Sequence, residues 1–257
     1  MPTIVLLTDF GSKDYFVGVM KGVIYSINPL ARIVDLTHEI EPQNVRQAAF
    51  VLWASRKYFP EDSIFVNVVD PGVGSKRKII CGSIDGQLFV APDNGLLDYV
   101  AAEAGEIQLH EAVNYRYFRN DVSTTFHGRD IFAPLSAHLS RGVKLNEVGD
   151  RFSYPKIARF YSKIEKGKNV GRVVYVDRFG NVFTSFLWND ELFENNVTVK
   201  VGTKLIRKFY ASYSISPTKA VVGIKGSSGL LELAINLGSA AKALRTSIGQ
   251  TVTLTLR

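Results

Sequence analysis

The sequence predicts an α/β N-terminal domain with a mostly parallel sheet, followed by a small all-β barrel domain. In the first half of the chain, short apolar runs alternate with longer segments of helical periodicity, which is typical of βαβ units. In the last third, short β-rich runs follow one another with turn residues between them, which favours a barrel or sandwich. We expect the α/β domain at residues 1–160, the β-barrel domain at 170–257 and a linker at about 150–169.

The first half contains three predicted strands and two predicted helices in alternation. The strands are expected at 3–7, 32–36 and 63–69, and the helices at 14–28 and 44–59. The first helix should end before Pro29, because proline disfavours helical backbone in the residue that precedes it. Asn44 is a plausible N-cap of the second helix.

A hairpin and two further helices complete the predicted α/β domain. The hairpin strands are expected at 78–84 and 87–91, joined by Asp85-Gly86, and the helices at 94–105 and 131–142. Residues 150–169 are polar, basic and weakly periodic, which indicates a linker. The runs "GRVVYVD", "NVFTSF", "NVTVKVG", "KAVVGI", "LLELAINL" and "QTVTLTLR" then predict the strands of the barrel.

Composition excludes several classes of protein. The 257 residues are 46% hydrophobic and 21% charged, close to the average for globular proteins. The net charge is +7, but the densest basic cluster, "SKRK" at 75–78, is too short for a nucleic-acid arm. Cys81 is the single cysteine, which excludes internal disulfides and cysteine-based zinc sites. Without a basic leader or an apolar stretch of about 18 residues, we expect a soluble, cytoplasmic protein with no membrane or nucleic-acid partner.

Acidic residues follow three predicted strands, at the sheet edge where open α/β sheets bind ligands. Asp9 follows the first strand, Asp70 begins "DPGVG" after the third, and Asp93 follows the hairpin. Asp9 could bond ligand hydroxyls or cap the next helix. The glycines of "DPGVG" could bring backbone close to a ligand, or Asp70 could only bond the amides of a structural turn.

The histidines predict no metal site. His38-Glu39 begins like H-E-x-x-H, but Pro42 stands where the second histidine should be. His127, in "STTFHGRDIFAP", has no partner at metal-ligand spacing, and it is either a catalytic or a structural histidine. His38, His110 and His138 are most simply residues at the ends of strands or helices.

Seven motifs, in order, resemble one enzyme family. They are "LLTDFG" (6–11), "INP…IVDLTHEI" (27–40), "FVNVVDPGVGSKRK" (65–78), "VAPDNGLL" (90–97), "STTFHGRDIFAP" (123–134), "VDRFGNVFTS" (176–185) and "LLELAINLGSAA" (230–241). Across nearly the whole chain, they are similar to the S-adenosylmethionine (SAM) hydroxide adenosyltransferases, or SAM hydrolases, relatives of fluorinases and chlorinases. The resemblance implies a homotrimer with active sites between subunits. The implied reaction is hydrolysis of SAM, by attack of water on C5′, to adenosine and L-methionine.

The resemblance also implies a catalytic trio of Asp70, Arg77 and His127. In the halogenating relatives the position of His127 is aromatic, and that of Gly128 is a serine that holds the halide. The fluorinase has a tyrosine at the position of Asp70. These differences favour water over halide as the nucleophile. The alternatives are a SAM-dependent halogenase and a non-catalytic protein that binds an adenosyl ligand.

The chemistry narrows the role of each group in that trio. Arg77 cannot be a base, because a guanidinium stays protonated in proteins, so its expected role is to orient Asp70. Asp70 and His127 are the candidates to orient the water and to relay its proton. Which of the two accepts the proton first stays open at this point.

The remaining substrate contacts are also implied by the resemblance, and no cofactor or metal is expected because SAM is the substrate. Asp9 corresponds to the acid that binds the ribose hydroxyls. Phe179 and Asn181 correspond to residues at adenine, Asp177 to the acid at the methionine ammonium, and Ser227, Ser228 and Glu232 to the methionine end. The fluorinase has an arginine at the position of Ser228. By themselves, Gly180-Asn181 could be a structural turn, Phe179 core, and Glu232 solvent-facing.

Overall fold

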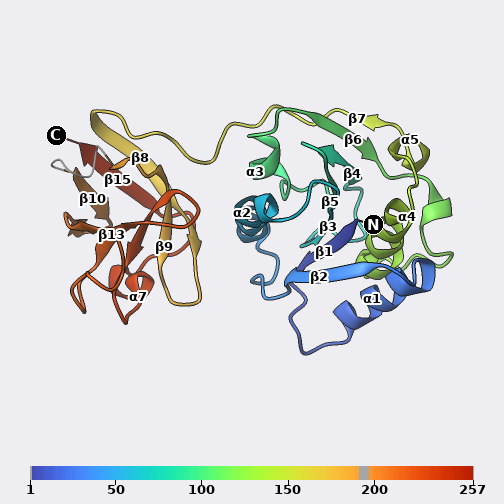
Figure 1. Cartoon of the computed structure of the whole chain (residues 1–257), viewed down its shortest axis with the longest axis horizontal. Helices are drawn as coiled ribbons and strands as arrows, with labels where there is room; N and C mark the ends of the chain where they lie inside the picture. The colour runs from blue at the N-terminus through green and yellow to red at the C-terminus, as the bar shows by residue number, and fades with distance from the viewer. Residues whose placement is uncertain (1, 191–196, 257) are drawn as a thin grey trace. The chain divides into compact units, whose positions relative to one another are not determined.

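The chain folds as two compact units, residues 1–158 and 159–257. The computed structural model describes residues 2–190 and 197–256 (Figure 1). Residues 1, 191–196 and 257, which the predicted domains include, lie outside the described residues. Within the predicted linker, residues 151–152 pair with the first sheet and residues 167–169 already belong to a strand of the second.

The first unit is built on a seven-stranded sheet of order β2-β1-β3-β5-β4-β6-β7. Its strands are β1 (Thr3–Thr8), β2 (Arg32–Thr37), β3 (Ile64–Val68), β4 (Ile79–Ile84), β5 (Gln87–Pro92), β6 (Ile107–Glu111) and β7 (Arg151–Phe152). The pairs β1–β2, β1–β3 and β3–β5 are parallel, whereas β4–β5, β4–β6 and β6–β7 are antiparallel. The predicted α/β class is confirmed, but the sheet is mixed rather than mostly parallel, because the hairpin reverses the chain and β6 and β7 extend that half.

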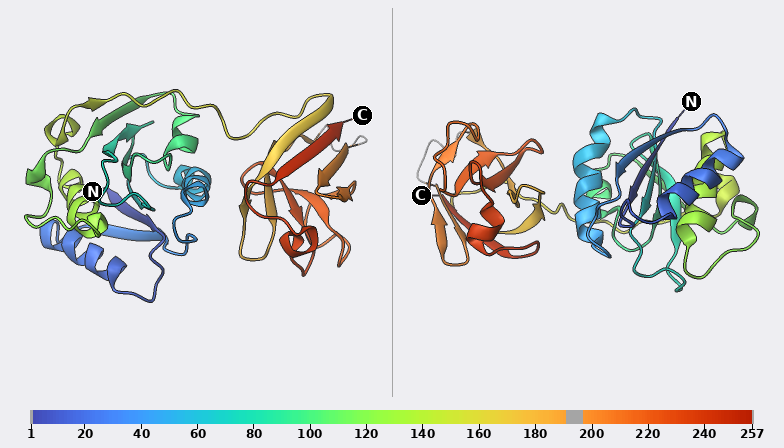
Figure 2. Two further views of the ribbon diagram at one scale, coloured as in Figure 1. Left: turned by 180° about the vertical axis from the view of Figure 1, so that it is seen from behind. Right: turned by 90° about the horizontal axis from the view of Figure 1, so that it is seen from below.

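Helices cover both faces of this sheet. The helical segments are α1 (Phe16–Ile27), α2 (Val45–Ser55), η1 (Arg56–Tyr58), α3 (Asp98–Ala101), η2 (Tyr115–Tyr117), the π-helical turn η3 (Gly128–Phe132), α4 (Ala133–Ser140) and α5 (Leu145–Val148). The helices α1 and α4 lie on one face and α2 on the other (Figure 2). Alternate residues of β1 face these two layers: Ile4 and Leu6 pack with α1 and α4, whereas Val5 and Leu7 pack with α2 and α3. Burial on both faces explains why β1 is continuously apolar.

The structure corrects the extent of two predicted helices. Instead of a helix over 94–105, only α3 is helical, because Gly95 has a left-handed φ of +93° and the Asn94 side chain accepts the Leu96 N–H in a turn. Of the helix predicted at 131–142, residues 131–132 belong to η3, and α4 itself runs from Ala133 to Ser140. The predicted N-cap is confirmed, since the Asn44 side chain accepts the Gln47 N–H.

The second unit is an eight-stranded, half-barrel sheet of order β11-β10-β15-β8-β9-β14-β13-β12. Its elements are β8 (Gly167–Val176), β9 (Val182–Leu187), β10 (Val197–Val201), β11 (Lys204–Ile206), β12 (Phe209–Tyr210), β13 (Val222–Lys225), β14 (Leu230–Ala234), α7 (Ala240–Leu244) and β15 (Thr251–Leu256). Its core includes Val173, Phe186, Val199, Leu231 and Leu254. The predicted all-β class is confirmed, and the short helix α7 is an addition. Within the described ranges, no helix has the length and apolar character needed to cross a membrane.

Candidate active site

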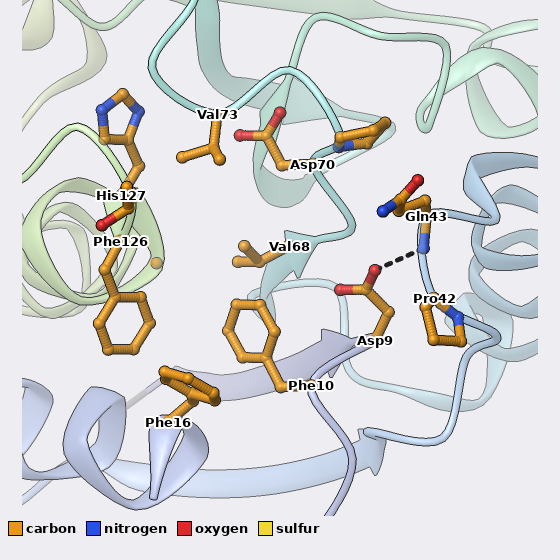
Figure 3. A pocket seen from close by; sticks show the side chains of 13 residues that line it. Asp9, Phe10, Phe16, Pro42, Gln43, Val68, Asp70, Val73, Phe126 and His127 are labelled. Atoms are coloured by element: carbon orange, nitrogen blue, oxygen red, sulfur yellow. Dashed lines mark hydrogen bonds between the residues drawn. The ribbon is translucent and has the colours of Figure 1, made fainter. Parts of the chain in front are cut away.

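The carboxyl ends of β1 and β3 border a cavity of about 390 Å³ in the first unit (Figure 3). The two strands are parallel neighbours, with Thr8 paired to Val68, so the acids that follow them open on the same side. His127 and Gly128 reach this cavity from the start of η3. It is lined by Asp9, Phe10, Phe16, Pro42, Gln43, Val68, Asp70, Pro71, Val73, Thr125, Phe126, His127 and Gly128.

Arg77 joins Asp70 to His127 at the edge of the cavity. Its Nε donates to Asp70 Oδ2 at 2.8 Å, and its Nη2 donates to the same oxygen at 2.5 Å. The same Nη2 lies 2.7 Å from His127 Nδ1. The side chains of Arg77 and Asp70 are only 9% and 5% exposed, so the pair is shielded from water. The structure therefore brings together three residues whose shared role the sequence implied only through resemblance.

A close backbone approach holds this arrangement. The loop after Asp70 turns at Gly74, whose φ is +76°. A Cβ at Gly74 would lie 2.4 Å from the carbonyl oxygen of Thr124, so only glycine fits there without a shift of the backbone. The contact packs the loop that carries Asp70 and Arg77 against the segment that leads into His127.

The contact with Arg77 fixes the tautomer of His127. An arginine side chain can only donate hydrogen bonds, so Nδ1 of His127 must accept and the proton of the neutral ring lies on Nε2. Burial and then the positive charge of Arg77 lower the pKa of His127 below its ordinary value of 6.5, with Asp70 and Asp130 opposing the shift. His127 is thus held as a neutral imidazole.

This environment predicts the titration of His127. We expect NMR to give His127 a midpoint below pH 6.5 and, because one cause is the charge of Arg77, a higher midpoint in Arg77→Met. The group binds its proton less readily in the folded state, so its contribution to stability is complete above about pH 6.5 and is lost as the pH falls through the folded-state pKa. An unchanged midpoint in Arg77→Met would contradict this account.

Asp9 faces the cavity and is tied to the loop before α2. Its Oδ2 accepts the backbone N–H of Gln43 at 2.7 Å. Gln43 has a left-handed φ of +67°, a strained conformation for a residue other than glycine. The alternative that Asp9 caps α1 is wrong, since the N-cap of that helix is Tyr15, without a side-chain cap.

Sequence reasoning missed an aromatic wall of the cavity. The rings of Phe10, Phe16 and Phe126 lie with centroids 5.1 to 5.9 Å apart. Two of them belong to the motifs "TDFG" and "TTFHG", beside the acidic and histidine residues that drew attention. Their position next to Asp9 and His127 in the sequence was the only sign that they line a cavity, because aromatic side chains in such positions are as often part of a hydrophobic core.

A second cavity, of about 530 Å³, lies in the second unit. It is lined by Asp177, Phe179, Asn181, Tyr213, Ile235, Asn236, Leu237 and Gly238. Asp177 Oδ1 accepts the N–H groups of Phe179 (2.9 Å) and Asn181 (2.8 Å), and its Oδ2 accepts from the Asn181 side chain at 2.9 Å. Asp177 therefore forms the turn, which leaves Phe179 77% exposed rather than in the core.

Glu232 lies beside this cavity without lining it. It is 1% exposed, so the alternative that it faces solvent is wrong. Burial and the nearby charge of Asp177 raise its pKa, although the Tyr213 hydroxyl, which donates to it, favours its ionised form. Its carboxylate lies against the turn at Gly226, which leads into Ser227 and Ser228.

Ser227 is exposed, whereas Ser228 Oγ is buried without a hydrogen-bond partner. Tyr213 is a further residue that sequence reasoning missed.

Across residues 2–190 and 197–256, no group of three or more His, Cys, Asp and Glu side chains is arranged to hold a metal ion. The two cavities are thus lined by carboxylates, aromatic rings and one neutral imidazole, and the Arg77 guanidinium contacts Asp70 and His127 among these groups.

Both units match models of one protein family. Residues 4–149 match the SAM hydroxide adenosyltransferase N-terminal domain, and residues 171–253 match the C-terminal domain of the same family. The chain is 34% identical over 261 residues to the (R)-S-adenosyl-L-methionine hydrolase of Thermus thermophilus, covering 99% of this chain and all of that protein. It is 29% identical to a fluorinase from an Actinoplanes species, covering 99% of this chain and 97% of the fluorinase.

The fold of this chain is also similar to that of a solved structure. The crystal structure of an uncharacterized conserved protein from Thermotoga maritima superposes with a TM-score of 0.89 at 40% identity, covering 98% of this chain and all of that one. Both domain models match in order, and the similarity to the Thermus hydrolase extends over the full length. The chain therefore belongs to the SAM hydroxide adenosyltransferase family, which is related to the fluorinases.

Proposed function

We propose that this chain hydrolyses S-adenosyl-L-methionine to adenosine and L-methionine. The observation that carries the proposal is the shielded contact of Asp70, Arg77 and His127 at one cavity, in a chain of this family. Water attacks C5′ of the adenosyl group, the C5′–S bond breaks, and its electron pair returns to the sulfonium sulfur as the neutral thioether of methionine. Because a sulfonium is a good leaving group, the protein has only to supply an oriented and partly desolvated water.

The hydrogen bonds support Asp70 as the first acceptor of the proton from that water. His127 Nδ1 is occupied by Arg77 and its Nε2 already carries a proton, so this ring offers a donor that orients the water. Asp70 Oδ1 accepts one contact from Arg77 Nε, at 3.0 Å, and retains a lone pair. Arg77 keeps Asp70 in place and cannot itself take the proton.

The substrate contacts follow the family resemblance. Asp9 binds the ribose hydroxyls, Phe179 and Asn181 hold adenine, Asp177 meets the methionine ammonium, and Ser227, Ser228 and Glu232 serve the methionine end. Because three of about four lone-pair positions on Asp177 are used within its own turn, the ammonium would take the remaining one. A cytoplasmic homotrimer with active sites between subunits, without a cofactor, completes the proposal.

Crowding at Gly128 supports a hydrolase over the halogenase alternative. A Cβ added there would lie 3.2 Å from the Phe126 ring, 3.3 Å from Met20 Sδ and 3.3 Å from the Phe10 ring. The serine that holds the halide in the halogenating relatives would therefore need these side chains to shift. Gly128 also has no side chain that could bind an anion.

The proposal is tested by incubating the purified protein with each sulfonium epimer of S-adenosyl-L-methionine, in chloride-containing buffer made with H₂¹⁸O. We expect adenosine carrying ¹⁸O on C5′, equimolar L-methionine, and almost no product from His127→Ala. The names of the relatives make the (R) epimer the expected substrate. A 5′-chloro nucleoside would establish the halogenase instead, and binding without turnover would favour the non-catalytic alternative.

A further inference from the structure

We infer that His38, acting through Thr8, is a positioning residue that holds Asp9 and Phe10 against the cavity. This inference rests on the proposed function, in which Asp9 binds the ribose. From its sequence position, His38 is most simply a residue at the end of a strand. Its contacts in the folded chain give it a more specific task.

The side chain of His38 lies between Thr8, the last residue of β1, and Asp35 of β2. Its Nδ1 lies 2.8 Å from Thr8 Oγ1, and its Nε2 lies 3.0 Å from Asp35 Oδ1. Thr8 is fully buried, and the side chain of His38 is 10% exposed. Lys21 donates to the other oxygen of Asp35 at 2.6 Å. Although burial opposes its ionisation, Lys21 and His38 keep the pKa of Asp35 below its ordinary value.

The chemistry of these groups indicates which of them donates and which accepts in each hydrogen bond. His38 Nε2 approaches the Asp35 carboxylate without the geometry of a hydrogen bond, and because an ionised carboxylate only accepts, this approach favours a ring proton on Nε2, on the side of Asp35. Nδ1 is then an acceptor, and the Thr8 hydroxyl donates to it. Thr8 Oγ1 in turn accepts the backbone N–H of Phe10 at 3.2 Å. A fixed hydroxyl therefore orients the residue directly after Asp9.

The backbone of His38 holds the same turn from its other end. Its carbonyl accepts the N–H of Gly11 at 2.7 Å, and Gly11 has a left-handed φ of +68°. Asp9 and Phe10 thus lie between Thr8 and Gly11, both of which are bonded to His38. Both line the cavity, whereas the catalytic trio is carried by the β3 loop and η3. Loosening this turn should therefore weaken substrate binding more than it slows the chemical step.

The test compares Thr8→Val, which removes the hydroxyl at nearly constant shape, with Thr8→Ser, which keeps it, and adds His38→Ala. His110→Ala is the matched control, because His110 is a largely buried histidine of the same unit whose Nδ1 lies 2.9 Å from the Gly149 carbonyl oxygen. Each protein is assayed for kcat and KM with S-adenosyl-L-methionine. Calorimetry then compares its affinity for adenosine and for 2′,3′-dideoxyadenosine, which lacks the hydroxyls that Asp9 would bind.

We expect Thr8→Val and His38→Ala to raise KM about fivefold to tenfold, with kcat within about threefold, and to lose a similar factor of preference for adenosine. Thr8→Ser and His110→Ala should stay within about twofold of the wild type. Unchanged KM and preference in folded Thr8→Val and His38→Ala would overturn the inference, as would an equal effect of His110→Ala. If the wild type binds adenosine but does not turn over S-adenosyl-L-methionine, the proposed hydrolysis fails. The preference of the variants for adenosine over 2′,3′-dideoxyadenosine then decides the inference about His38. If the wild type neither turns over S-adenosyl-L-methionine nor binds either nucleoside, both fail.

Discussion

Asp70→Asn is expected to lower kcat for S-adenosyl-L-methionine hydrolysis by about 10²- to 10⁴-fold, with KM changed only a few-fold. The amide has nearly the shape of the carboxylate, but it cannot accept the proton of the attacking water at neutral pH. In the wild type, Arg77 donates to both carboxylate oxygens of Asp70. The amide of the variant has only one oxygen that can accept such a hydrogen bond, and its N–H₂ group cannot accept one. The attacking water would then lose both its proton acceptor and a fixed partner.

The matched control for this substitution is Asp93→Asn, which removes a carboxylate just after β5 in the same unit. Steady-state kinetics and thermal unfolding of both variants separate a loss of chemistry from a loss of fold. A folded Asp70→Asn protein that kept most of the wild-type kcat would show that Asp70 is not the proton acceptor.

Arg77→Lys is expected to lower kcat about 100-fold and the free energy of unfolding by about 3 kcal/mol. A lysine ammonium cannot reproduce the planar fork that contacts Asp70 through two nitrogens and His127 through one of them. Since both partners of the ion pair are largely shielded from water, imperfect replacement leaves Asp70 partly unpaired. Asp70 and His127 would then lose their common anchor.

Arg56→Lys is the control for this prediction. Arg56 also faces an aspartate, Asp85, at 3.3 Å, but in a more exposed pair away from the cavity. Chemical denaturation should place this variant within about 0.5 kcal/mol of the wild type, with unchanged kcat. Equal losses in the two arginine variants would mean that Arg77 acts only through general stability.

Local pattern was enough to predict most of the first unit. The unbroken apolar runs of β1 and β3, the helical spacing of α1 and α2, and the turn at Asp85-Gly86 each depend on neighbours in sequence. The strand order was not needed to expect Asp9 and Asp70 at one edge, because parallel strands end on the same side of a sheet. The strand β6 was not predicted, although its residues alternate between apolar and polar from Ile107 to His110, and its pairing with β4 identifies it in the structure.

The sequence by itself determined the two fold classes, the order of the longer helices and strands and, through its motifs, the family to which the chain is similar. Only the tertiary structure decided which groups meet. It joined Arg77 to His127, 50 positions apart, and thereby set the tautomer of that ring. It also buried Glu232 beside Tyr213 and linked His38 to Thr8. The physical reason is that periodicity and turn chemistry act over a few residues, whereas burial, hydrogen-bond partners and pKa values arise from segments that only folding brings into contact.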